Sequence, residues 1–176
     1  MRRQSLFESA HRCLSLCDPA DKCAAVAALA DAHAAGCVHA DPEYPLKPIG
    51  PPGRPDRPVL VDASRVPRRR LGSPQGRAAL VHAVAHIEFN AINLAWDAVY
   101  RFRGLPREYY DDWVQVALEE SRHFALLRDR LADLGRAYGD FPAHNGLWYM
   151  AQRTAQDLLA RMAMVPRVLE ARGLDV

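Results

Sequence analysis

The sequence lacks any apolar run close to the ~20 residues that a helix needs to cross a membrane. It also lacks an excess of one charge, because 23 lysines and arginines against 21 acidic residues leave a net charge of +2. This charge does not support a nucleic-acid partner. The basic start of the chain, residues 1–4, is followed by no hydrophobic stretch typical of a signal peptide. We therefore expect a cytoplasmic protein without a membrane partner.

Cysteine is scarce and is not arranged for a zinc site. The four cysteines are 4, 6 and 14 positions apart, which matches no Cys-x-x-Cys pattern: Cys13, Cys17, Cys23 and Cys37. Cys13 and Cys17 are one helical turn apart, which leaves a metal or redox pair as an alternative. We favour the interpretation that they are small core residues in a reducing compartment.

The rest of the composition is that of one globular domain. The 176 residues are 49% hydrophobic and 25% charged, which excludes general disorder and allows a sizeable core. Residues 1–36 are rich in alanine and leucine and predict two short helices, over 4–17 and 19–35. Residues 37–72 form a proline-rich arm, because nine of the thirteen prolines lie between Pro42 and Pro74. In this arm only residues 59–61 are strand-like, and the arginines of 65–70 indicate a solvated loop rather than a phosphate site.

Residues 73–176 are expected to form a helical bundle. Capping residues and glycines predict three long helices, over 73–102, 106–134 and 146–172, joined by short loops. Helices of this length with short connections pack as antiparallel neighbours. The sequence therefore predicts an all-α fold.

Acidic side chains interrupt the apolar faces of the first two long helices. Glu88 falls in the middle of an apolar stripe that runs from Val81 to Phe102, and a buried carboxylate must be paired, protonated or bound to metal. His82 and His86 point away from Glu88 on the helical wheel, so we expect them at the flank or the surface.

The second long helix carries a Glu-x-x-His pair. Glu120 lies at the centre of its apolar stripe and His123 at the edge, one turn further on. This spacing lets a carboxylate and an imidazole from one helix reach one metal ion. A second Glu-x-x-His, Glu8 to His11, is interpreted as a solvated face. On the third long helix the apolar stripe is defined by Trp148, Ala155, Leu159 and Ala163. Glu170 extends this stripe, which makes it a candidate for a third carboxylate or a helix-end charge.

Three segments resemble an uncharacterised bacterial ferritin-like family, a domain of unknown function. They are residues 86–97 (HIEFNAINLAWD), 119–127 (EESRHFALL) and 169–175 (LEARGLD). The resemblance implies a ferritin-like helical bundle with a di-iron centre, and a characterised relative of that family is the di-iron tRNA hydroxylase that acts on modified adenosine. It also implies four metal ligands, Glu88, Glu120, His123 and Glu170. Family members continue into a fourth ligand helix, so we expect a bundle that is incomplete at the C-terminus.

Two classes of function follow from these observations. The first is a non-haem di-iron oxidoreductase or hydroxylase of unknown substrate, with two iron ions and with manganese or zinc as alternatives. The second is a non-enzymatic metal-binding or interaction module that retains part of a ferritin-like site, with metal storage or sensing as a variant. A homodimer or a further C-terminal helix would complete the bundle, and the chain alone is expected to expose an apolar strip.

Overall fold

The computed structural model describes residues 4–67 and 72–167, which are mostly helical, as predicted. The helices, in chain order, are α1 (Leu6–Ser15), α2 (Pro19–Ala34), η1 (Ala63–Arg65), α3 (Pro74–Arg101), α4 (Arg107–Asp133), α5 (Gly146–Arg153), α6 (Leu158–Met162) and η2 (Ala163–Arg167). Two short strands, β1 (Gln4–Ser5) and β2 (Val38–His39), pair in parallel.

Local sequence signals set the helix boundaries. The side chain of Asp18 accepts hydrogen bonds from the first turn of α2, and Ser73 does the same for α3, each followed by a proline at the first helical position. Gly104 and Gly135 end α3 and α4 with φ values of 69° and 67°, a conformation that glycine adopts without strain. Four of the predicted helices therefore form close to their expected bounds.

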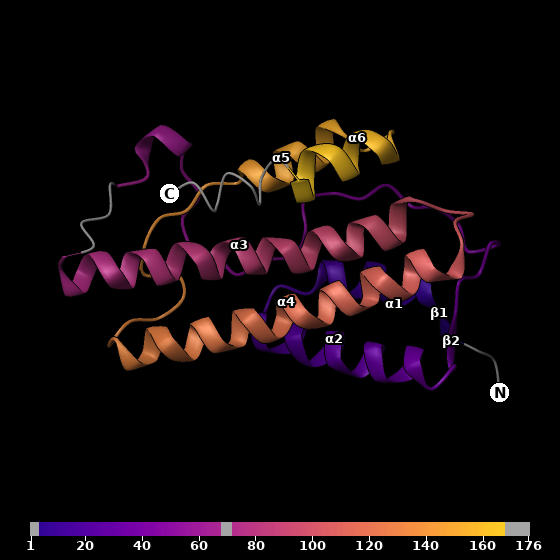
Figure 1. Ribbon diagram of the computed structural model, residues 1–176, viewed down its shortest axis with the longest axis horizontal. Helices are drawn as coiled ribbons and strands as arrows, with labels where there is room; N and C mark the ends of the chain where they lie inside the picture. The colour runs from indigo at the N-terminus through magenta and orange to yellow at the C-terminus, as the bar shows by residue number, and fades with distance from the viewer. Residues whose placement is uncertain (1–3, 68–71, 168–176) are drawn as a thin grey trace.

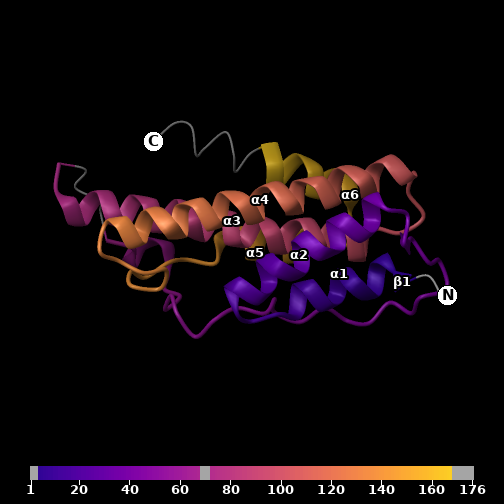
Figure 2. The same ribbon diagram turned by 90° about the horizontal axis from the view of Figure 1, so that it is seen from below.

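The long helices α3 and α4 run antiparallel along the molecule and form its centre (Figure 1). Helix α1 packs on α3 and α2 packs on α4. Figure 2 shows α1 and α2 on one side of the α3–α4 pair and α6 on the opposite side. The short N-terminal helices thus complete a four-helix core with α3 and α4, and one edge of the α3–α4 pair faces away from them.

Helix α3 is the core helix of this arrangement. Its length and composition would suit a membrane span, but 56% of its most apolar window is buried inside the bundle. Buried polar side chains, including Asn90, Asn93 and Asp97, also lie along it. Packing inside the fold therefore accounts for its apolar character.

The prediction of a third long helix is wrong, because the helix that begins at Gly146 ends at Arg153 and a separate helix, α6, follows. The Thr154 hydroxyl donates to the Met150 carbonyl, and the Asp157 side chain accepts a hydrogen bond from the Ala160 N–H and begins α6. An aspartate at this position competes with helix continuation because it caps a new first turn. Leu159, predicted on the buried stripe, is 81% exposed.

The proline-rich arm crosses α1 and α3 as an extended segment. The Gly53 N–H donates to the Leu14 carbonyl at 2.8 Å, and the Lys47 N–H donates to the Tyr100 hydroxyl at 2.7 Å. Leu60 forms an isolated bridge with Ala143 in the loop before α5. The arm therefore covers a side of α3 that would otherwise face solvent.

Candidate metal centre

Two carboxylates and an imidazole meet between α3 and α4. Glu88 comes from α3, and Glu120 and His123 come from α4; one ligand atom of each lies within 4.8 Å of the others. The Nδ1 nitrogen of His123 is 3.1 Å from Glu120 Oε2 and 3.9 Å from Glu88 Oε2. Within residues 4–67 and 72–167 this is the one group of three such side chains close enough to share a metal ion.

The geometry follows from the pairing of the two helices. Glu88 and Glu120 each lie near the middle of their helix, and antiparallel packing places these midpoints side by side. Residues three apart on a helix project from the same face, so His123 lies one turn beyond Glu120 on the side of Glu88.

The cluster has an apolar inner side and an open outer side. The buried rings of Phe89 and Phe124, each next in sequence to a cluster residue, lie with centroids 5.4 Å apart. The side chains of Glu88 and Glu120 are 19% and 20% exposed, whereas that of His123 is 54% exposed. The cluster therefore lies at the edge of the core that faces away from α1 and α2.

This position corrects the predicted centring of Glu120 on its apolar stripe. The buried residues of α4 lie further round the helix, toward the N-terminal helices: Tyr110, Val114, Ala117, Ser121, Phe124 and Leu131. Helix α2 packs against α4 and buries this other face of it. The apolar pattern of α4 taken alone does not show where α2 packs.

The donor set suits a transition-metal ion. Carboxylate oxygen and imidazole nitrogen are ligands for iron, manganese and zinc, and a site with three protein donors leaves positions open for water or substrate. A divalent ion would also offset the repulsion between two carboxylates held this close.

Comparison with known proteins places the chain in a family. The family described as "Protein of unknown function (DUF455)" matches residues 15–176. The chain belongs to this family. An uncharacterised protein of Haemophilus influenzae is 54% identical over 128 residues, which are 69% of this chain and 44% of that protein. The chain thus spans less than half the length of this relative. No solved structure matches, so the ferritin-like resemblance stays a prediction.

The other predicted candidates of this DUF455 chain are placed differently or lie outside the described residues. Glu170 lies outside them, as do three arginines of segment 65–70. Glu8 is exposed, and the ring of His11 lies 5.0 Å from that of Tyr100, so this pair joins no metal-binding group of the described chain. Cys13 is buried as predicted, but Cys17 is exposed, and the four cysteines are free.

The prediction for His82 and His86 is wrong, since both are buried. His82 Nε2 accepts a hydrogen bond from the Gly139 N–H at 2.9 Å, and His86 Nδ1 lies 2.9 Å from the Tyr138 hydroxyl. Burial lowers the pKa of His86 to about 4, which keeps its ring neutral at pH 7. The available signal was a line of short polar residues at helical spacing on α3: His82, His86, Asn90, Asn93 and Asp97.

Proposed function

We propose that this protein is a non-haem di-iron oxidoreductase or hydroxylase with a ferritin-like centre, to which Glu88, Glu120 and His123 supply ligands. The observation that carries the proposal is the meeting of their donor atoms within 4.8 Å, from two adjacent antiparallel helices. Ferritin-like di-iron proteins use single glutamates and Glu-x-x-His pairs from such helices. The residues that form this cluster are also those that carry the ferritin-like resemblance.

The resemblance adds Glu170 as a fourth ligand, three positions beyond the last described residue. Two iron ions held by these four residues would supply the chemistry of O₂ activation, by which a substrate is oxidised. A second copy of the chain or a further C-terminal helix would supply the ligands that are still missing. The substrate is unknown, and we place the protein in the cytoplasm without a membrane or nucleic-acid partner.

The chain's own residues would separate the two sides of such a centre. Phe89 and Phe124 exclude water from the inner side, because both rings are buried and packed together. The half-exposed His123 lies on the side that solvent reaches, so a substrate would approach from that edge. His123 Nδ1 is the ring nitrogen turned toward the carboxylates. Its hydrogen bond to Glu120 orients the imidazole in the absence of metal.

Anaerobic titration with Fe(II), followed by exposure to O₂ and absorption spectroscopy, tests the proposal. We expect bound iron and a charge-transfer band in the wild type, and loss of both in Glu88→Gln, Glu120→Gln and His123→Gln. Glu119→Gln is the matched control, because Glu119 is an exposed neighbour that accepts a hydrogen bond from Gln115. Iron binding that is equal in the control and in the three ligand variants would refute the site.

A metal-binding module without turnover is the second candidate. It is favoured by the 54% exposure of His123, because di-iron chemistry needs a site that excludes bulk water. The same titration separates the two: a module would bind metal through the three residues, with neither the O₂-dependent band nor O₂ consumption.

A further inference from the structure

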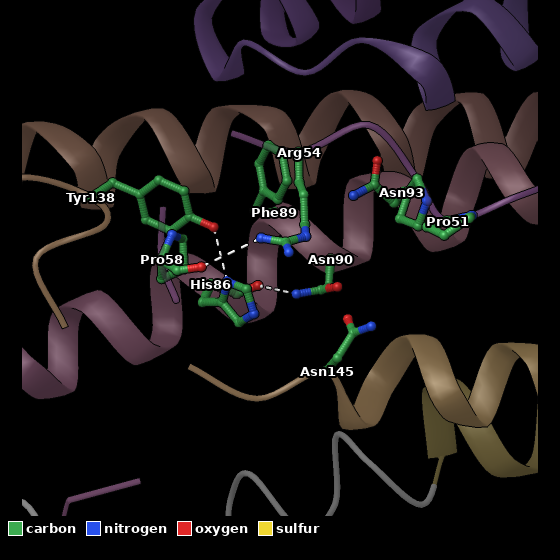
Figure 3. Close-up of a pocket in the computed structure, with 10 residues that line it drawn as sticks. Pro51, Arg54, Pro58, His86, Phe89, Asn90, Asn93, Tyr138 and Asn145 are labelled. Atoms are coloured by element: carbon green, nitrogen blue, oxygen red, sulfur yellow. Dashed lines mark hydrogen bonds between the residues drawn. The ribbon is translucent and has the colours of Figure 1, made fainter. Parts of the chain in front are cut away.

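A second polar site lies between the proline-rich arm and α3. It is a cavity of about 30 Å³, lined by Pro51, Pro52, Arg54, Pro58, His86, Phe89, Asn90, Asn93, Tyr138 and Asn145. Figure 3 shows the guanidinium of Arg54, the ring of His86 and the amides of Asn90 and Asn145 converging on it. His86 is two residues from Glu88, about 200° round the helix, so this cavity is separate from the candidate metal centre.

His86 presents a buried nitrogen to this cavity. The His86 residue is 8% exposed, and its Nδ1 lies 2.9 Å from the Tyr138 hydroxyl. Its Nε2 is buried and makes no hydrogen bond in the described chain. Burial raises the pKa of Tyr138, so the phenol keeps its proton, and we assign the tautomer in which this hydroxyl donates to Nδ1. In this tautomer the single proton of the neutral imidazole is on Nε2, which makes this nitrogen a donor. The His144 backbone lies near the ring, but among the described residues no acceptor has hydrogen-bond geometry toward Nε2.

Two asparagines add further amide groups to the lining. The Asn93 side-chain oxygen accepts a hydrogen bond from the buried Lys22 ammonium at 2.7 Å, which fixes the amide orientation and leaves the Nδ2 group for the cavity. Lys22 also donates to the carbonyls of Cys13 and Leu14, so it is held firmly. Asn90 Nδ2 donates one of its two hydrogens to the His86 carbonyl.

Arg54 brings a positive charge to the same place. Its Nη1 makes two long hydrogen bonds, 3.4 Å each, to the carbonyls of Pro55 and Pro58. Among the described residues, no carboxylate lies within 4.0 Å of it, and no acidic residue lines the cavity. A cation, a buried Nε2 that makes no hydrogen bond and amide groups with spare N–H hydrogens, with no carboxylate among them, are what an anion requires.

We propose that this cavity binds the carboxylate group of a small ligand, held by Arg54, the Nε2–H of His86 and the asparagine amides. A volume of about 30 Å³ suits a group of this size. A larger groove of about 470 Å³ shares Asn145 with the cavity and offers Val61 and Tyr149 as apolar surface. The carboxylate therefore comes either from a free small anion or from a longer acid whose body lies in this groove.

Binding of sodium formate and sodium hexanoate, with sodium chloride at equal ionic strength as reference, tests the proposal. The measurements are thermal melts and the ¹⁵N signal of the His86 imidazole, on protein kept in chelator so that the metal centre does not contribute. Ligand at about ten times its Kd should raise the Tm by roughly 3–5 °C and shift the His86 signal. A lower Kd for hexanoate than for formate identifies the longer acid, and equal values identify the free anion.

Arg54→Gln should weaken binding at least about tenfold, because a charge-assisted hydrogen bond is lost. Arg54 is exposed, so this variant should fold even if His86→Gln does not. Arg57→Gln is the matched control, since Arg57 is exposed on the same arm and does not line the cavity. Equal effects of formate and chloride, unchanged binding in Arg54→Gln, or an unmoved His86 signal would overturn the proposal. These readouts involve no metal, so their failure leaves the proposed di-iron function standing.

Discussion

Arg161 of α6 reaches across to Asp97 of α3, and its Nη1 donates to Asp97 Oδ2 at 2.5 Å with both side chains buried. Arg161 also donates to the Thr154 hydroxyl and to the Ala151 carbonyl, while Arg101 pairs with the same carboxylate at 2.7 Å. The interruption between α5 and α6 allows this contact, because it turns the chain so that the Arg161 side chain reaches Ala151 and Thr154 at the end of α5. The ion pair therefore fixes where the C-terminal part of the described chain lies on α3.

Removal of the buried charge of Asp97 should destabilise the fold strongly. Asp97→Asn leaves the Arg161 guanidinium buried without an anion, which typically costs about 3–5 kcal/mol. Arg101→Gln should cost less, about 1.5 kcal/mol, since Asp97 keeps its ion pair with Arg161 when the hydrogen bonds from Arg101 are lost. Urea unfolding of the two variants checks this difference. Equal losses of stability would mean that Arg161 does not depend on Asp97.

The sequence was sufficient to predict features that depend on neighbouring residues. The Asp18 and Ser73 caps and the Gly135 stop define their helices locally, so the bounds of α2, α3 and α4 follow from them. The meeting of Glu88 with Glu120 and His123 was also predictable, because antiparallel helices of similar length place their midpoints together. A metal ligand role for these three residues remains a prediction.

Features that depend on distant packing were not predictable. The burial of His86 results from the arm that covers it, and no pattern in α3 shows where the arm lies. The break after Arg153 is stabilised by Arg161 and Asp97, which are 64 positions apart. A helical wheel treats each helix by itself, so it placed Leu159 inside and both histidines at the flank or surface.

The arm requires glycine at position 53. A Cβ atom there would lie 2.2 Å from the Ser15 carbonyl oxygen and 2.4 Å from that of Leu16, which backbone atoms cannot accommodate without a shift. Gly53→Ala should therefore loosen the arm and cost about 1–3 kcal/mol, as overpacking does. Gly50→Ala is the control, because nothing lies within 4 Å of its Cβ position. Urea unfolding and limited proteolysis within residues 37–67 measure both effects, and equal behaviour of the two variants would contradict the close contact.

Stability should fall as the pH drops from about 6.5 to 4 because of His86. Its folded pKa is about 4 and its unfolded value is 6.5, so in this window the unfolded chain binds a proton that the folded chain does not. The stability that depends on a neutral His86 is fully present above pH 6.5 and fully lost below pH 4. The free energy of unfolding should change by about 3 kcal/mol between these limits. The backbone of His144 beside the ring favours the charged form and offsets part of this lowering of the pKa, whereas the charges of His82, His144 and Arg54 disfavour it.

His86→Gln should flatten this dependence, whereas His11→Gln, at a partly exposed histidine of α1, should leave it unchanged. The measurement is the free energy of unfolding in urea at several pH values between 4 and 7. A wild type and a His86→Gln variant with the same slope would show that another group is responsible.

The candidate metal centre predicts opposite effects of its carboxylates with and without metal. Without metal, Glu120→Gln should leave the Tm unchanged or raise it, because it removes a partly buried charge that lies beside Glu88. With Fe(II) or Mn(II) at about 100 times its Kd, binding should add about 2.7 kcal/mol to the wild type and raise its Tm by roughly 5–10 °C. The variant should lose that gain. Thermal melts with metal and with chelator measure both effects, and Glu119→Gln is the control. A wild type that melts at the same temperature in metal and in chelator would contradict metal binding at Glu88, Glu120 and His123.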